Sequence, residues 1–214
     1  MSHLADSDGE NSRNIEYAVG RFDTCIDLVR AAGANPSIVH IAQSAGSIRA
    51  HSRYANTVRL GIGLYGINPL PVNHKMYEQL SGLKPALRFT STITHVIELQ
   101  KGDKVSYGYT FTAPRNMRIG IVPVGYYEGV NRALSNGGLA KIGERSTPIV
   151  GRVCMNHTMI SLEGTDAQEG AEVLIYSNDP VDPNAINNLV VQHDLFCYSL
   201  LTALNSDVRR LLVE

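Results

Sequence analysis

A serine and a glycine-rich run offer a hydroxyl and backbone N–H donors that suit a phosphate group. Ser44 follows a short apolar run, and residues 58–66 read Val-Arg-Leu-Gly-Ile-Gly-Leu-Tyr-Gly. Glycine allows backbone N–H groups to approach phosphate oxygens closely, and loops after the last strands of a barrel commonly bind phosphate. The pattern indicates a phosphate cradle made by Ser44, Gly61 and Ile62. Taken alone, however, such a run favours the simpler interpretation that the glycines only turn the chain.

Five segments resemble motifs of the alanine racemase family and occur in the family's order. The segments, each followed by the motif it resembles, are His40–Ser44 with residues 58–66 (HxANSAA, then VRPGIALYG), Val105–Thr110 (VSYGxT), Val124–Gly129 (GYADG), Pro148–Met155 (PVVGRVCMD) and Cys197–Arg210 (YE…RVPR). The resemblance extends from His3 to Arg210. It implies an enzyme that interconverts L-alanine and D-alanine with pyridoxal 5'-phosphate and supplies D-alanine for peptidoglycan.

The resemblance implies that Arg59 donates a hydrogen bond to the pyridine nitrogen of the cofactor. A guanidinium remains protonated and can only donate, so that nitrogen would stay unprotonated and side reactions such as transamination would be disfavoured. His3, in the run Met-Ser-His-Leu-Ala-Asp, matches a family histidine that hydrogen-bonds the arginine. A structural role is the alternative for a single histidine.

Tyr107 matches the family's second catalytic base, which moves the α-proton on the substrate face opposite the cofactor lysine. An unperturbed phenol, with a pKa of about 10, is a poor base, so cationic neighbours are expected around it. A buried strand tyrosine is the alternative. The surrounding Val-Ser-Tyr-Gly-Tyr-Thr match and the 19-residue step to Tyr126 favour the catalytic role.

The remaining carried-over residues concern substrate, phosphate and assembly. Tyr126 and Met155 match positions that line the substrate entrance and meet the substrate carboxylate, and Tyr198 matches a tyrosine that reaches the cofactor phosphate. In the family the region of Tyr107, Tyr126 and Met155 completes the partner subunit's site. The resemblance therefore implies a homodimer with shared sites.

The family anchors its cofactor on a lysine at the end of the first barrel strand, and no lysine here matches that position. The five lysines all lie in or after the expected linker: Lys75, Lys84, Lys101, Lys104 and Lys141. The lysine is both the cofactor anchor and the base for one substrate face. We therefore expect a truncated or split chain that is inactive alone.

Smaller departures from the family pattern fall near the expected entrance and phosphate. They are Gln43 for Asn, Leu60 for Pro, Tyr127-Glu128 for Ala-Asp, and Asn156 for the Asp after Met155. They put in question the substrate contacts of the Met155 loop more than the family resemblance.

The first third of the chain has an α/β pattern. Apolar residues spaced by three and four predict a helix over 13–31, with a Ser7–Glu10 pair and Asn11 as its cap and with a buried stripe of Ile15, Val19, Phe22, Ile26 and Val29. Residues 38–42 predict a strand buried on both faces, and a small helix at 47–54 and a second run at 58–67 repeat the unit. Residues 1–72 are expected to be the end of a TIM (β/α)8 barrel that binds the cofactor.

After a proline-containing connection over residues 68–85, the pattern changes to short strands. Residues 87–99 alternate apolar and polar side chains, and further strands are expected at 118–124, 139–142, 148–155, 159–162 and 172–176. Helices are expected only at 185–192 and 199–204. Residues 85–214 are thus predicted to form a mainly antiparallel β-barrel domain.

Composition narrows the partners. The chain has 19 basic against 20 acidic residues and no long run of like charge, so nothing favours nucleic acid or a membrane surface. The cysteines, Cys25, Cys154 and Cys197, form no CxxC pair, which argues against a zinc site or disulfide framework. No segment is typical of a signal peptide or a membrane span, so we expect a cytoplasmic protein with a small amino-acid substrate and no metal.

Two other functions compete with racemisation. A non-catalytic interaction or regulatory remnant would keep the fold without using Tyr107. A related barrel-plus-β-domain amino-acid decarboxylase would place a carboxylate against the pyridine nitrogen, and Arg59 and the Ser-Tyr-Gly-Tyr motif speak against it.

Overall fold

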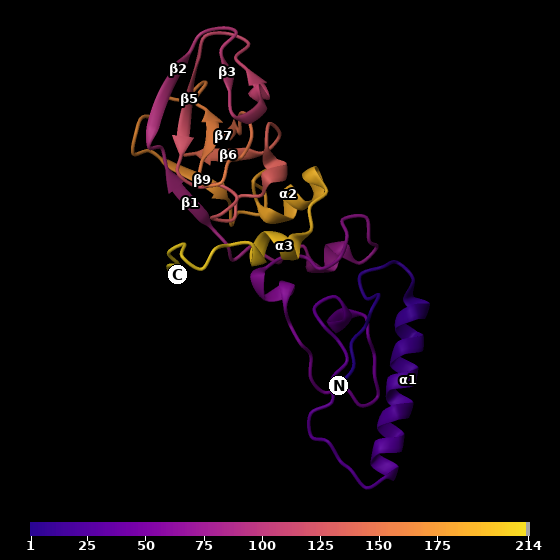
Figure 1. Cartoon of the computed structure of the whole chain (residues 1–214). Helices are drawn as coiled ribbons and strands as arrows, with labels where there is room; N and C mark the ends of the chain where they lie inside the picture. The colour runs from indigo at the N-terminus through magenta and orange to yellow at the C-terminus, as the bar shows by residue number, and fades with distance from the viewer. Residues whose placement is uncertain (213–214) are drawn as a thin grey trace. The chain divides into compact units, whose positions relative to one another are not determined.

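The computed structural model describes residues 1–212 and divides the chain into two compact units. The first unit is Met1–Lys84, and the second begins at Pro85. Figure 1 shows that the first unit contains the long helix α1, whereas the second contains the strands and the helices α2 and α3. Each unit is described by itself below.

Helix α1, Ser12–Ala31, confirms the predicted helix and Asn11 as its cap. The Asn11 side chain accepts a hydrogen bond from the backbone N–H of Arg13 at 3.0 Å, which satisfies one of the free donors of the first turn. The buried face contains Ile15, Val19, Phe22, Asp23 and Ile26. Val29 was wrongly placed on this face, because it is 40% exposed near the helix end.

The expected strand at 38–42 does not form as a ladder. Val39 and Ile41 pack into the core of α1, and Ala42 is also buried, while Ile38 is exposed, so the segment is fully buried on one side and only in part on the other. Its backbone pairing is sparse: Ser2 N–H donates to His40 O, Asn56 N–H to Val39 O, and Arg59 N–H to Ala42 O. A single parallel bridge joins Gln43 to Arg59. The segments run side by side, but too few consecutive hydrogen bonds link them to make a sheet.

The rest of the first unit contains three short 3₁₀ helices. They are η1 (Gly46–Ile48), η2 (Ile62–Tyr65) and η3 (Tyr77–Leu80). The small helix expected at 47–54 is therefore limited to one turn, and the run at 58–67 is a 3₁₀ turn after the bridge residue Arg59. Gly66 ends η2 with a φ of 69°, a conformation that favours glycine.

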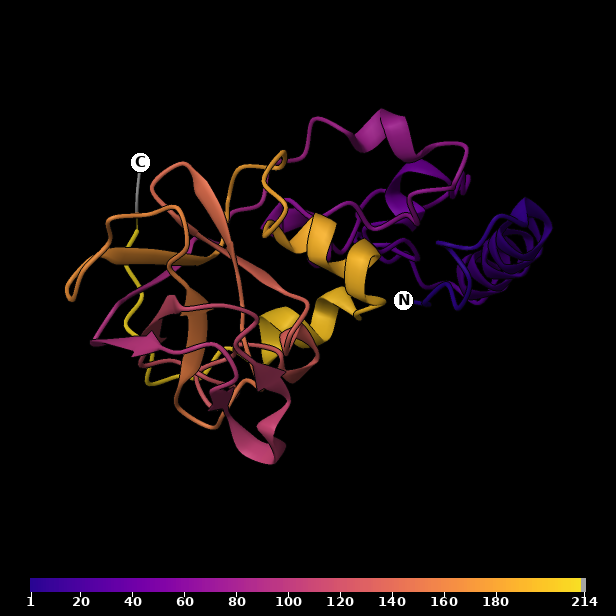
Figure 2. The ribbon, with the colours of Figure 1, turned by 90° about the horizontal axis from the view of Figure 1, so that it is seen from above.

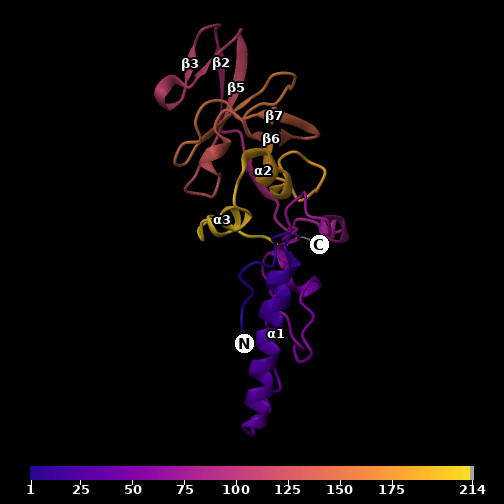
Figure 3. The same cartoon turned by 90° about the vertical axis from the view of Figure 1, so that its right-hand side faces the viewer.

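Residues 85–212 of the second unit contain nine short strands in three antiparallel sheets. Their orders are β1-β9-β6-β7, β2-β5-β8 and β3-β4, and the β2–β5 pair can be followed in Figure 3. The strands are β1 (Phe89–Thr92), β2 (His95–Leu99), β3 (Lys104–Val105), β4 (Phe111–Thr112), β5 (Met117–Val122), β6 (Leu139–Ile142), β7 (Arg145–Pro148), β8 (Thr158–Ser161) and β9 (Glu172–Tyr176).

Two predicted strands are corrected. The alternating run at 87–99 divides into β1 and β2 because the chain changes sheets there: Ile93 N–H donates to Ala171 O, and Thr94 N–H to Ile121 O. In the run at 148–155 only Pro148 belongs to a strand, and the chain then turns at Gly151, whose φ is 75°. The β3–β4 hairpin was not predicted, since two-residue strands leave no periodic pattern.

Two α-helices follow the strands in the described part of the second unit, α2 (Ile186–His193) and α3 (Cys197–Thr202). They agree with the predicted helical tail and contact each other, as Figure 2 shows for the yellow part of the ribbon. Leu189 of α2 and Leu200 of α3 are fully buried, as are Ile119 and Ile160 of the β2-β5-β8 sheet. Within residues 1–212, no helix combines the length and apolar composition needed to cross a bilayer.

Candidate functional site

Arg59 is the centre of a hydrogen-bonded group in the first unit. Its Nη1 lies 2.5 Å from His40 Nδ1, and its Nη2 lies 3.1 Å from His3 Nδ1. Nη2 also donates to the backbone oxygens of Ser2 and Ile41, at 2.9 and 3.1 Å. The structure thus brings His3 to Arg59. Among the described residues no acceptor contacts Nε of Arg59, so this N–H remains available to a ligand.

His40 takes part in this group as a neutral imidazole. Partial burial and the positive charge of Arg59 both lower the pKa of His40 below its usual value of 6.5. A neutral ring can accept the Arg59 hydrogen bond through Nδ1, whereas a protonated ring cannot. His40 and the backbone acceptors therefore fix the guanidinium in one orientation.

Ser44 and the glycine-rich run converge in the same unit. The Ser44 side chain is buried, and its Oγ accepts hydrogen bonds from the N–H groups of Gly61 and Gly63 at 3.0 and 3.2 Å. Within residues 1–212, the N–H of Ile62 has no acceptor. The three expected cradle residues are thus together, and Gly63 adds a donor that sequence reasoning did not single out.

Tyr107, Tyr126 and Met155 line one cavity of about 560 Å³ in the second unit. Two arginines, Arg132 and Arg152, line the same cavity. Tyr107 is 72% exposed, which excludes the alternative of a buried strand tyrosine. Within the described part of the chain neither guanidinium is paired with a carboxylate, so the cavity combines a phenol with two uncompensated positive charges.

The loop that carries Tyr107 is held by the residue before it. Ser106 Oγ donates to the backbone oxygen of Arg152 and accepts from the backbone N–H of Arg152, at 3.1 and 2.9 Å. Gly108 has a φ of 71°, and a Cβ there would lie 3.5 Å from Arg152 Nη2. The Arg152 guanidinium therefore lies against the residue that follows Tyr107.

Tyr126 and Met155 belong to two loops joined by main-chain hydrogen bonds. Tyr126 N–H donates to Cys154 O at 3.0 Å, and Tyr127 N–H donates to Met155 O at 2.9 Å. The approach requires glycine at position 125, since a Cβ there would lie 2.1 Å from Cys154 O. Beyond these loops, the buried Tyr176 hydroxyl accepts from Asn131 N–H and donates to Gly129 O.

Tyr198 lies in α3 of the second unit and stacks on Phe196, with ring centroids 5.0 Å apart. Its side chain is partly exposed. The expected contact of Tyr198 with the cofactor phosphate stays a prediction, because Ser44 belongs to the other unit.

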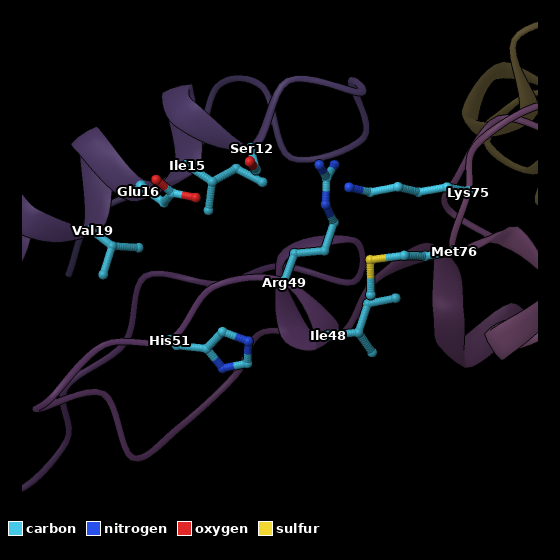
Figure 4. A pocket seen from close by; sticks show the side chains of 9 residues that line it. All are labelled: Ser12, Ile15, Glu16, Val19, Ile48, Arg49, His51, Lys75 and Met76. Atoms are coloured by element: carbon cyan, nitrogen blue, oxygen red, sulfur yellow. The ribbon is translucent and has the colours of Figure 1, made fainter.

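A separate cavity of about 330 Å³ lies in the first unit beside the start of α1 (Figure 4). Arg49 and Lys75 point toward each other there, next to the apolar side chains of Ile15, Ile48 and Met76. None of the residues expected to contact the cofactor lines it. Groups of three or more metal-binding side chains are also absent from residues 1–212.

Comparison with protein-family models matches both parts of the chain. The C-terminal domain of alanine racemase matches residues 86–212, and the N-terminal domain matches residues 1–69. The chain belongs to the alanine racemase family.

Individual alanine racemases agree with this assignment. The chain is 35% identical to alanine racemase of Lactobacillus acidophilus over 216 residues, which cover 100% of this chain and 56% of the relative. The crystal structure of the Bacillus anthracis alanine racemase with bound L-Ala-P matches with a TM-score of 0.83 and 27% identity, covering 95% of this chain and 52% of that one. The Pseudomonas aeruginosa biosynthetic enzyme matches with a TM-score of 0.81 and 27% identity, over 100% and 56%. The chain therefore spans about half the length of these alanine racemases.

Sequence reasoning missed three side chains of the candidate site. His40 and Arg152 stand inside motifs already noted for the family, so their positions were available although no role was given to them. Arg132 lies in η5 (Arg132–Leu134), after the Tyr126 motif, and carries no motif signal of its own. Its place beside Tyr107 becomes visible only in the folded chain, where both residues line the same cavity.

Proposed function

We propose that this chain supplies part of an alanine racemase that uses pyridoxal 5'-phosphate: the contacts to the cofactor ring and phosphate, and the acid/base group of one substrate face. The observation that carries the proposal is the cavity in which Tyr107, Tyr126 and Met155 meet two arginines. Alanine is the substrate favoured by the family, and the positive charges suit its carboxylate.

The residues of the first unit fit the cofactor. Among the described residues the N–H of Ile62 has no acceptor and would bind a phosphate beside the Ser44 hydroxyl, which the N–H groups of Gly61 and Gly63 hold in place. Arg59 keeps Nε available to an acceptor such as a pyridine nitrogen. The bound cofactor would supply the electron withdrawal that makes the α-proton of an amino acid removable. Arg59, fixed by His40 and His3, would hold the pyridine nitrogen unprotonated, because it can only donate.

Tyr107 would take and return the α-proton on one face through its phenol oxygen. A phenolate that forms during this transfer carries negative charge, and the guanidiniums of Arg132 and Arg152 in the same cavity would stabilise it. The substrate carboxylate would be held by the same positive charges. Exclusion of water would fall partly to the apolar side chains of Val153 and Met155.

The acid/base group of the other face would come from outside this chain. Of the five lysines, Lys141 is buried and paired with Asp182 at 2.7 Å, and Lys104 lies over the Tyr109 ring in the β3–β4 hairpin. Within the described residues, no lysine hydrogen-bonds to the Arg59 group or to Ser44. We therefore propose that the chain is inactive alone and that the lysine is contributed by another polypeptide segment.

The wider assignments belong to the same proposal. Residues 1–72 would form the end of the cofactor-binding barrel, and residues 85–214 the C-terminal β domain. The active assembly would be a cytoplasmic homodimer in which Tyr107 of one protomer serves the other protomer's cofactor. The likeness to alanine racemases over nearly the whole chain supports these assignments.

Complementation tests the proposal. The chain is coexpressed with a segment that carries the cofactor lysine and the first barrel strands of an alanine racemase, and conversion of L-alanine to D-alanine is measured. We expect racemisation that neither partner shows alone and that falls by about two orders of magnitude or more in Tyr107→Phe, the range typical of a lost acid/base group. Tyr109→Phe in the same loop is the matched control and should retain activity.

The same experiment tests the competing function. A non-catalytic remnant predicts that the complemented assembly shows no activity above background and that Tyr107→Phe changes nothing. Either result would overturn the racemase proposal.

A further inference from the structure

Two residues that depart from the family pattern are hydrogen-bonded to each other. Glu128 stands in the loop that carries Tyr126, and Asn156 directly follows Met155. Asn156 Nδ2 donates to Glu128 Oε1 at 2.7 Å, and both side chains are partly buried. The two departures therefore form one contact between the two loops.

The other oxygen of Glu128 fixes its own loop. Oε2 accepts a hydrogen bond from the backbone N–H of Gly125 at 2.7 Å. One carboxylate thus joins the start of the Tyr126 loop to the side chain that follows Met155. Hydrogen bonds to an ionised acceptor are roughly twice as strong as neutral ones, so this contact adds to the backbone bonds already linking the loops.

The choice of Asn rather than Asp at 156 follows from the chemistry of the contact. Both oxygens of Glu128 receive donors, and a carboxylate at 156 would have nothing to donate. Two carboxylates at hydrogen-bonding distance repel, and one of them would have to keep a proton. The amide of Asn156 avoids this repulsion.

We propose that Glu128 and Asn156 are a positioning pair that fixes Tyr126 and Met155 relative to each other and so sets the shape of the cavity around Tyr107. That this cavity receives alanine rests on the proposed function; the positioning itself does not. Neither Glu128 nor Asn156 lines the cavity, so the pair would act on it through the two loops.

A donor–acceptor exchange tests the pair in the full chain. In Asn156→Asp the two carboxylates face each other and the loops should separate. In the double variant Glu128→Gln/Asn156→Asp, the Gln amide can donate to the new carboxylate while its oxygen accepts from Gly125 N–H, so the contact is restored. Glu128→Gln alone should be mild, because the Asn156 amide can turn and offer its oxygen. Asn116→Asp is the matched control, since Asn116 Oδ1 acts only as an acceptor, from Lys101 N–H.

Nuclear magnetic resonance gives two readouts that need no activity. Amide hydrogen exchange at Tyr126 and Tyr127 should accelerate by about tenfold in Asn156→Asp, the effect of losing one charge-assisted hydrogen bond, while exchange in β9 stays unchanged. The Met155 methyl resonance should shift in this variant. Both readouts should return to their wild-type values in the double variant. Wild-type exchange rates and resonance positions in Asn156→Asp, or no recovery in the double variant, would overturn the proposal that the two residues position the loops.

Kinetics separate this inference from the proposed function. In a complemented assembly, Asn156→Asp should raise the KM for alanine more than it lowers kcat. A loss in kcat at constant KM would show that the pair does not shape the substrate pocket. An assembly without any activity counts against the proposed function, and the resonance measurements on the chain still decide the positioning pair.

Discussion

Arg59 owes its fixed orientation to acceptors from two separate segments, residues 2–3 and residues 40–41. His3, His40 and the backbone oxygens of Ser2 and Ile41 surround its guanidinium. Each acceptor removes one freedom of the side chain, so that Nε points to a defined place. A protonated His40 would replace one acceptor by a like charge, and the group therefore depends on the neutral ring.

The pKa of His40 is the first prediction at this scale. A histidine titration followed by resonance spectroscopy should give His40 a pKa below the usual value of 6.5, and Arg59→Gln should raise it, because a positive neighbour is removed and the ring becomes more exposed to water. Because the folded pKa is depressed, the stability contributed by neutral His40 is present above pH 6.5 and is lost as the pH falls from 6.5 through the folded value. A pKa at or above 6.5 in the unaltered chain would contradict this account.

Gly125 gives a second residue-scale prediction. A methyl group at this position would lie 2.1 Å from Cys154 O and 2.4 Å from Met155 O, which are backbone atoms that cannot turn away. Gly125→Ala should lower the free energy of unfolding by about 1–3 kcal/mol or more, as overpacking typically does. Gly82→Ala is the control, because nothing lies within 4 Å of a Cβ there. Urea denaturation measures both, and equal midpoints for the two variants would refute the close approach.

Single residues of the site were predictable to different degrees. Ser44 and Gly61 were singled out by the glycine-rich run together with the family motif, and the structure joins them by a hydrogen bond of 3.0 Å. Arg132 was not singled out, because its position relative to the noted motifs does not distinguish it from an ordinary surface arginine. Glu128 and Asn156 were both noted as departures, yet their hydrogen bond emerged only from the meeting of two loops, because the two residues are 28 positions apart.

At the scale of elements, α1 is the part of the fold that the sequence describes best. Twenty residues allow the period of 3.6 to repeat over several turns, so chance patterns are averaged out. The cap was also readable, since Asn before an apolar periodic run is a common helix start. The error at Val29 arises because the packing ends one turn before the helix does.

Helix α1 should respond to changes at its cap and at its single interior glycine. Asn11→Ala should destabilise the chain by about 0.5–2 kcal/mol through loss of the bond to Arg13 N–H. Gly20→Ala should instead raise the free energy of unfolding by about 0.5–1 kcal/mol, because alanine favours the helix and a Cβ there meets nothing within 4 Å. Thermal unfolding followed by circular dichroism measures both. A change in stability of the same sign in both variants would contradict the assigned helix.

The strands show where sequence patterns stop being informative. Residues 87–99 alternate without interruption, and nothing in that alternation marks the change of sheet between Ile93 and Thr94. Tertiary pairing with β9 on one side and β5 on the other decides it. Residues 38–42 likewise have the composition of a strand, but a ladder also requires neighbours that pair over several residues, and these segments offer only single bonds.

At the scale of the whole molecule, the chain is proposed to supply the acid/base group for only one of the two substrate faces. Family membership is established over nearly the whole chain, which spans about half the length of the alanine racemases it matches. The proposal assigns Arg59, Ser44 and Tyr107 to this chain and the cofactor lysine to another segment. Its central claim is therefore a division of labour: Tyr107 serves one substrate face only.

Exchange of the α-proton in D₂O tests that claim most directly. In a complemented assembly, both enantiomers of alanine should incorporate deuterium at Cα. In Tyr107→Phe, exchange should be lost for the enantiomer whose α-proton faces Tyr107 and retained for the other, whereas Tyr109→Phe should exchange both. Equal exchange of L-alanine and D-alanine by the Tyr107→Phe assembly at the unaltered rate would contradict the account.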